Sequence, residues 1–227
     1  WSASIDGDIR FWDAHTGMEI SRIKHNGLLR FCALSPDSQR IALALRFQLQ
    51  LRDVSTGQEL FSVRRANNDV TDCVFSLDGG MIAAAMGSKV MLYDASDGHP
   101  IAEFPAGEIR HHGWTQCALS PDGRYIAAIA RQRHEFSVWE IQSGKETINQ
   151  KRSYARSLTY SPSGRYLGFT NEVAAYLEDT RAQNSIKKFE HDKSNSEFNH
   201  FSPDEKLFFA SRSRKLRIWE GDSGRLL

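Results

Sequence analysis

The chain has 227 residues and nearly balanced charge, since 29 lysines and arginines face 28 aspartates and glutamates and leave a formal net charge of +1. This length suits one all-β domain, and net charge alone gives no argument for nucleic acid or membrane. No apolar run approaches the roughly 18 residues of a transmembrane helix, and no charged-then-apolar leader opens the chain. We therefore expect a cytoplasmic protein with no membrane partner. Because the chain begins at Trp1 in mid-pattern, we also expect an N-terminal part, with any targeting signal, to be missing.

Taken in order, the chain repeats one pattern of short strands and turns. Residues 1–13 read as a strand tail, a tight turn at Asp6-Gly7 and a strand ending at Trp12-Asp13. The serine of the first turn then recurs at Ser35, Ser76, Ser120, Ser161 and Ser202. The intervals of about 41 to 44 residues match the period of a four-stranded propeller blade. We predict blade units at approximately 1–24, 25–63, 64–105, 106–150, 151–190 and 191–227.

Each unit carries residues suited to its predicted turns and strands. In the Ser-Pro-Asp-Gly turn at 120–123, Pro fixes φ, Asp bonds its own backbone and Gly accepts a positive φ. The run 126–130, Ile-Ala-Ala-Ile-Ala, is apolar on both faces, as expected for a strand between neighbouring sheets. An acid follows the third strand of the units, and a glycine closes the next turn, at Gly17, Gly57, Gly98, Gly144 and Gly224.

These features resemble the WD-repeat (WD40) family across essentially the whole chain. The ends of the third strands at 11–13, 92–94, 138–140 and 218–220 look like the terminal dipeptide of that family, and the two turns look like its two reversals. The resemblance implies an all-β propeller of four-stranded antiparallel blades that gathers protein partners. It would hold about five and a half blades here, so we expect a segment of a larger propeller.

The chain also departs from the family pattern. The Gly-His dipeptide survives only as Lys24-His25, and the inter-strand Asp is evident only at Asp6. We read Arg52 and Leu177 as standing where the second and fifth units should carry Trp. The His-Ser-Asp-Trp hydrogen-bond network of the family is then largely missing, so we expect the blades to rely on apolar packing.

The three cysteines share one structural position. Cys32, Cys73 and Cys117 each lie three residues before a repeat serine, which indicates buried packing positions. A reactive or zinc-binding role is the alternative. The odd count and the absence of an Asn-x-Ser/Thr acceptor fit a reducing compartment.

No catalytic constellation is visible in the sequence. There is no Gly-x-Ser-x-Gly elbow, and Gly144-Lys145 lacks the upstream glycine of a phosphate-binding loop. His111, His112 and His134 could be imagined as a metal site, but no acid or cysteine at ligand spacing joins them, so solvated loop histidines are the favoured interpretation. We expect no enzyme activity, no metal and no cofactor.

Charge is distributed unevenly between the two predicted faces of the propeller. The loops joining fourth to first strands and second to third strands are rich in basic residues, whereas the other turns are rich in acids. This predicted basic top face, with an excess of about seven positive charges, comprises Arg46, Arg64, Arg65, Arg110, His111, His112, Trp114, Arg131, Arg133, His134, Arg212, Arg214 and Lys215. An ordinary solvated surface is the alternative interpretation.

The sequence therefore favours a non-catalytic scaffold that binds proteins through the basic top face. The partners would be other proteins, or other domains of the same longer chain, and acidic or phosphorylated ligands suit arginine forks. One alternative is a sensor or autoinhibitory propeller attached to an ATPase or kinase. Another is a platform for RNA or phosphopeptides, and a propeller-type hydrolase is disfavoured because no nucleophile and base are paired.

Overall fold

The structure, a computed structural model, describes the chain in segments. The described residues are 2–3, 7–64, 69–105, 116–130, 135–151, 155, 157–170, 174–180, 186–190, 196–212, 215–221 and 223–227. Within these segments every named element is a β-strand, so the all-β prediction is confirmed. No helix among them is long and apolar enough to cross a membrane. The chain divides into two compact units, 1–114 and 115–227, and we describe each by itself.

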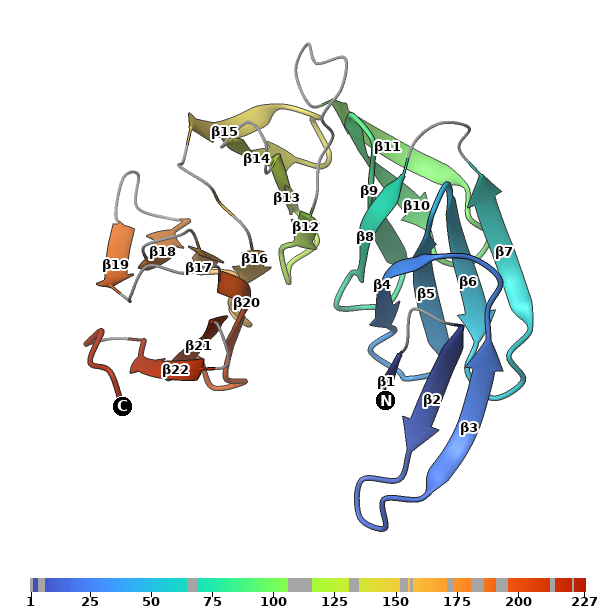
Figure 1. Ribbon diagram of the computed structural model, residues 1–227. Helices are drawn as coiled ribbons and strands as arrows, with labels where there is room; N and C mark the ends of the chain where they lie inside the picture. The colour runs from blue at the N-terminus through green and yellow to red at the C-terminus, as the bar shows by residue number, and fades with distance from the viewer. Residues whose placement is uncertain are drawn as a thin grey trace. The chain divides into compact units, whose positions relative to one another are not determined.

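The first unit contains three antiparallel sheets (Figure 1). The first sheet consists of β1 (Ser2–Ala3), β2 (Asp8–Trp12) and β3 (Glu19–Lys24). The second consists of β4 (Leu29–Leu34), β5 (Arg40–Leu45), β6 (Gln48–Asp53) and β7 (Glu59–Arg64). The third consists of β8 (Val70–Phe75), β9 (Met81–Met86), β10 (Lys89–Asp94) and β11 (Pro100–Pro105).

The second unit repeats this arrangement. The fourth sheet consists of β12 (Gln116–Leu119), β13 (Tyr125–Ala130), β14 (Glu135–Glu140) and β15 (Glu146–Lys151). The fifth consists of β16 (Ser157–Tyr160), β17 (Tyr166–Thr170), β18 (Ala174–Asp179) and β19 (Ile186–Glu190). The sixth consists of β20 (Ser196–Phe201), β21 (Leu207–Arg212) and β22 (Lys215–Glu220). Each strand pairs with its neighbours in the sequence, which gives the meander of a propeller blade.

The serine turns join the first two strands of the second to sixth sheets, as predicted. In the second sheet the Ser35 hydroxyl donates to Asp37 and accepts the Arg40 amide at 2.9 Å. The last turn residue has a positive φ in all five turns, including the non-glycine residues Ser38 at 59° and Glu205 at 58°. The backbone geometry of the turn is thus kept even where the glycine of the sequence pattern is lost.

Apolar residues fill the space between neighbouring sheets. Between the second and third sheets, Ala42, Leu51, Ile82 and Ala84 are fully buried and belong to one cluster. The run 126–130 in the fourth sheet is buried throughout, as its sequence predicts. Cys32, Cys73 and Cys117 are free and buried, and burial raises the pKa of the Cys32 thiol to about 11. The packing role of these cysteines is therefore confirmed.

The strand register corrects one position of the sequence analysis. Ile126 pairs with Trp139 in the fourth sheet, and the equivalent Leu167 of the fifth sheet pairs with Glu178. Glu178, not Leu177, therefore occupies the Trp position, and it is only 3% exposed. Leu177 points to the other face of the fifth sheet, where it joins the cluster shared with Phe208. The interpretation of Leu177 was wrong because the family pattern places a large apolar residue directly before an acid. Leu177 followed by Glu178 fits that pattern in the sequence but not in the strand register.

Candidate interaction surface

Most of the predicted basic top face lies outside the described residues. This is the case for Arg65, Arg110, His111, His112, Trp114, Arg131, Arg133, His134 and Arg214. Arg212 and Lys215 pair with each other in the backbone of the β21–β22 hairpin. The side chains of Arg46 and Arg64 are described, and both are exposed at one end of the second sheet. We call this the Arg46 end and define it by Leu28, Arg30, Phe31, Arg46, Phe47, Arg64 and Asp69.

Arg46 occupies the two-residue turn between β5 and β6. Its backbone N–H donates to the carbonyl oxygen of Leu28 at 3.0 Å, which fixes the turn against the segment entering β4. Its side chain is 57% exposed, and its Nε lies 3.7 Å from Asp69 Oδ1. The guanidinium also lies over the ring of Phe47, 4.8 Å from the ring centroid. Exposed pairs of this kind contribute at most about 1 kcal/mol to stability, so the Arg46 side chain remains available to a ligand.

Asp69 connects this turn to a second arginine. Arg30 Nη2 donates to Asp69 Oδ2 at 3.1 Å, so one carboxylate lies between two guanidinium groups. The backbone carbonyl of Asp69 accepts from the Gly87 amide at 3.1 Å, which anchors it to the third sheet. The Arg46 end thus carries three arginines and one acid. Sequence reasoning missed Arg30 because it lies in a strand, at the register shift between Leu29 and Phe31, and not in a loop.

Exposed apolar side chains accompany these charges. Phe47 is 39% exposed, Leu28 is 41% exposed and Phe31 is 44% exposed. Phe47 also has a φ of 68°, the left-handed conformation that glycine and asparagine adopt far more readily. Sequence reasoning missed these three residues because it chose loop residues by charge, with Trp114 as the one apolar residue that it included. The available signal was a phenylalanine in a two-residue turn between strands, where turn-forming residues are expected.

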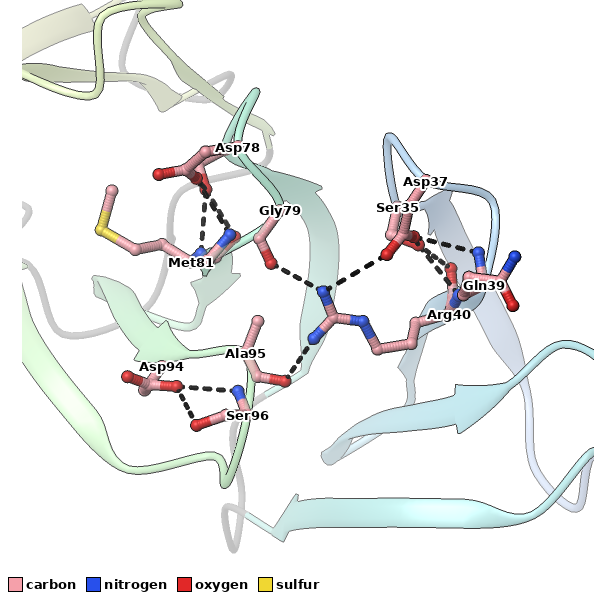
Figure 2. A network of polar contacts seen from close by, with 12 residues as sticks. Ser35, Asp37, Gln39, Arg40, Asp78, Gly79, Met81, Asp94, Ala95 and Ser96 are labelled. Atoms are coloured by element: carbon pink, nitrogen blue, oxygen red, sulfur yellow. Dashed lines mark hydrogen bonds and ion pairs between the residues drawn. The ribbon is translucent and has the colours of Figure 1, made fainter.

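The opposite end of the second sheet contains an arginine with a different environment. Arg40 Nη1 donates to the carbonyl oxygen of Ala95 at 2.9 Å, and its Nη2 donates to that of Gly79 at 3.0 Å. Figure 2 shows this guanidinium reaching from the second sheet to the two carbonyls of the third. Its side chain is 24% exposed, and it lies 5.9 Å from the centroid of the Phe75 ring. We call this the turn end of the sheet, and its arginine joins two sheets.

The repeated acids also belong to the turns, as predicted. Asp53 Oδ1 accepts from the hydroxyl of Ser55 and from the amide and hydroxyl of Thr56 at 2.7 to 2.8 Å. These bonds, that of Ser55 first, lower the pKa of Asp53 to about 2. Asp13 and Asp94 make equivalent bonds in the first and third sheets. Such carboxylates hold their turns closed and are not free to bind a ligand.

The described residues offer no metal site, and they keep a Trp-Ser bond of the WD-repeat kind in the first sheet, where Trp12 Nε1 donates to Ser2 Oγ at 2.9 Å. No group of three or more His, Cys, Asp or Glu side chains in the described segments could hold a metal ion. His25 is buried, and its two ring nitrogens have no hydrogen-bond partner among the described residues. Arg52, at the Trp position of the second sheet, donates to the carbonyls of Lys24 and Gly57. In this sheet, an arginine that bonds backbone carbonyls replaces the Trp of the family pattern.

Sheets of up to four antiparallel strands in meander order, packed face to face within each unit, define a β-propeller. A structure of hydrazine synthase from Kuenenia stuttgartiensis agrees, with a TM-score of 0.81, 18% sequence identity and coverage of 95% of this chain and 71% of that chain. At this identity the likeness shows the fold alone.

No family model matches the chain, but WD-repeat relatives do. It is 25% identical over 141 residues to the uncharacterized WD repeat-containing protein sll1491 of Synechocystis, which covers 61% of this chain and 40% of that protein. It is 27% identical to mouse WD repeat-containing protein WRAP73, over 63% of this chain and 30% of the relative. Mouse apoptotic protease-activating factor 1 is 26% identical over 72% of this chain and 11% of its own length. The chain is thus similar to WD-repeat proteins at 25 to 27% identity, as its sequence pattern indicated, and it spans less than half the length of these relatives.

Proposed function

We propose that the chain is a non-catalytic WD-repeat scaffold that binds partner proteins through its basic top face. The observation that carries the proposal is the Arg46 end, where Arg30, Arg46 and Arg64 lie with exposed apolar side chains. Arginine and aromatic residues are the side chains most enriched at the centres of protein interfaces. The similarity to other WD-repeat proteins supports a propeller that mediates interactions.

The proposed partners carry acidic groups. The planar guanidinium fork matches a carboxylate or a phosphate in two parallel hydrogen bonds. Among the described residues, Asp69 is the acid paired with Arg30 and Arg46, so the Arg46 end keeps a positive excess. The remaining basic residues of the predicted face, such as Arg131 and Arg133, lie outside the described residues and stay a prediction.

The test is affinity capture from lysate with two variants of equal charge change. The double variant Arg46→Glu with Arg64→Glu alters the proposed face. The control, Lys145→Glu with Lys206→Glu, alters exposed lysines in turns that join first to second or third to fourth strands, which were not predicted to belong to that face. Each capture is run with and without nuclease. We expect specific proteins to be lost only with the Arg46/Arg64 variant and to survive nuclease. Capture that disappears with nuclease would favour the RNA platform, and equal capture by both variants would reject the basic face.

A second candidate is a sensor propeller in a longer multidomain chain. The alignments to mouse and human apoptotic protease-activating factor 1 favour it, because they cover 72% and 79% of this chain but only 11% and 12% of those proteins. The Arg46 end would then contact another domain of the same polypeptide. The complete open reading frame tests this candidate: a nucleotide-binding domain in it supports the sensor, and its absence leaves the scaffold.

A further inference from the structure

The conformation of Phe47 has a cost that the fold does not impose. Phe47 has a φ of 68° in the two-residue turn between β5 and β6. In the equivalent turn of the third sheet, Gly87 occupies the first position, that of Arg46, and has the positive φ of 57°, which glycine adopts without steric conflict. Ser88, at the position of Phe47, has no positive φ, so this hairpin can be closed without a left-handed residue at its second position. A bulky aromatic residue in the left-handed region is a backbone outlier, and such outliers gather at binding sites.

Burial does not offset this cost. Phe47 is 39% exposed, whereas the large aromatic residues of the core, such as Tyr93 and Phe136, are at most 1% exposed. Its recorded ring contact is the guanidinium of Arg46, 4.8 Å from the ring centroid. The ring is thus presented to solvent with a cation stacked on it, which is the arrangement of an interface anchor before its partner arrives.

The surroundings of Phe47 define the ligand. Leu28 and Phe31 are exposed at the same end of the sheet, and the Arg46 amide bonds the Leu28 carbonyl. Three arginines and one acid leave an excess of about two positive charges, with Asp69 set between Arg30 and Arg46. That carboxylate would repel a phosphate backbone running along the surface. A single carboxylate of a ligand can instead replace it on one guanidinium while an apolar side chain covers Phe47.

On these grounds, and resting on the proposed scaffold function, we infer that the Arg46-Phe47 turn binds an acidic peptide segment that carries an aromatic or large aliphatic side chain beside a carboxylate. Phe47 supplies the apolar contact, and Arg46 supplies the charge-assisted hydrogen bonds. In this proposal, the Phe47 side chain serves binding, and the strained left-handed backbone at this position is its cost.

The experiment is a selection of random 12-residue peptides displayed on phage against the full chain. We expect enriched peptides to place Asp or Glu next to Trp, Tyr, Phe or Leu. One such peptide, synthesised and labelled, should bind at least about tenfold more weakly to Phe47→Asn and to Arg46→Gln, a loss of about 1.4 kcal/mol. The control is Leu60→Asn, because Leu60 is exposed at 47% in β7 of the same sheet but near its turn end. This control should bind within about twofold of the parent, a difference under about 0.5 kcal/mol.

The fold of the variants is checked in parallel. Phe47→Asn and Phe47→Gly should unfold at an equal or higher temperature than the parent, because both residues accept a positive φ more readily than Phe. A weaker peptide affinity in a more stable protein cannot come from misfolding, and Phe47→Gly serves if the Asn variant fails to express.

Three outcomes would overturn the inference. Enriched peptides without acidic residues would show that the surface does not select a carboxylate. Unchanged affinity of Phe47→Asn would show that Phe47 does not contact the peptide. Displacement of the peptide by a 12-residue oligouridine, with steep salt dependence, would assign the surface to RNA. If lysate capture depends on Arg46 and Arg64 while peptide affinity ignores Phe47, the scaffold function stands and this inference alone fails.

Discussion

The two ends of the second sheet place the same residue type in opposite environments. At the turn end, Arg40 donates to two backbone carbonyls of the next sheet and is largely covered. At the Arg46 end, Arg46 shares one carboxylate with Arg30 and leaves most of its side chain in water. A charged group with fixed carbonyl partners stabilises the fold, whereas one with a loose, shared partner is available for binding. The identity of its partners, more than its charge, indicates what an arginine does here.

The largest loss of stability is expected at Gly98, where a side chain would clash with the neighbouring sheet. A Cβ at Gly98, in the turn between β10 and β11, would lie 2.6 Å from a ring atom of Phe61 in the neighbouring sheet. The equivalent Gly17 has a similar φ but nothing within 4 Å of such a Cβ. Gly98→Ala should cost about 1–2 kcal/mol for the positive φ and about 1–3 kcal/mol more for the clash, whereas Gly17→Ala should incur the first cost only. Urea unfolding of both variants checks the difference, and equal costs would show that Phe61 moves away freely.

Next in size is the loss of the Arg40 contacts. Arg40→Gln cannot reach both Ala95 and Gly79, so a pair of charge-assisted bonds is lost, and we expect a free energy of unfolding lower by about 2 kcal/mol. The matched change Arg124→Gln removes one exposed ion pair with Glu140 and should cost at most about 1 kcal/mol. Chemical denaturation measures both, and a larger loss for Arg124→Gln would contradict the structural role of Arg40.

A gain of stability is expected at the Arg46 end. Phe47→Asn relieves a left-handed conformation that costs an ordinary residue about 1–2 kcal/mol, so the variant should be about 1 kcal/mol more stable. Leu60→Asn, whose backbone is not in this region, should show no such gain. Thermal and urea unfolding measure the change. Destabilisation by Phe47→Asn would mean that the ring contributes to packing, and the contrast between the two ends would weaken.

The smallest effect is a pH dependence confined to the turn acids. The pKa of Asp53 is lowered to about 2 in the folded chain, below its unfolded value of about 3.9. Its contribution to stability is therefore complete above about pH 4 and is lost as the pH falls through about 2. Asp53→Asn should flatten the dependence of the urea midpoint on pH within this window, as measured from pH 5 downward. An unchanged slope would show that Asp53 titrates normally.

Local pattern predicted the fold better than the site. Local sequence was enough to predict three features: the serine turns, the buried run 126–130 and the cysteine positions. Each depends on residues that lie close together in the chain. Leu177 was wrongly assigned to the Trp position because a shift of one residue in a strand exchanges its two faces, and only the pairing of Leu167 with Glu178 fixes that register.

The site depends on contacts that no local pattern reveals. Arg40 meets Ala95 in the following sheet, 55 residues later in the sequence, and Asp69 meets Arg30 across 39 residues. The residue type of Phe47 does not predict its backbone angle, and its place in a two-residue turn was the one signal in the sequence. Of the predicted basic residues, Arg46 and Arg64 can be followed in the described segments, and the rest of the face stays a prediction.

The most direct test of this account measures stability and peptide affinity for Arg40→Gln and Arg46→Gln side by side in the full chain. We expect opposite results for the two variants. Arg40→Gln should lower the urea midpoint and bind the selected acidic peptide normally at a temperature where it is folded. Arg46→Gln should unfold like the parent and bind at least about tenfold more weakly. If both variants lose stability and affinity together, the two ends do not differ in role, and the Arg46 end is not the interaction surface.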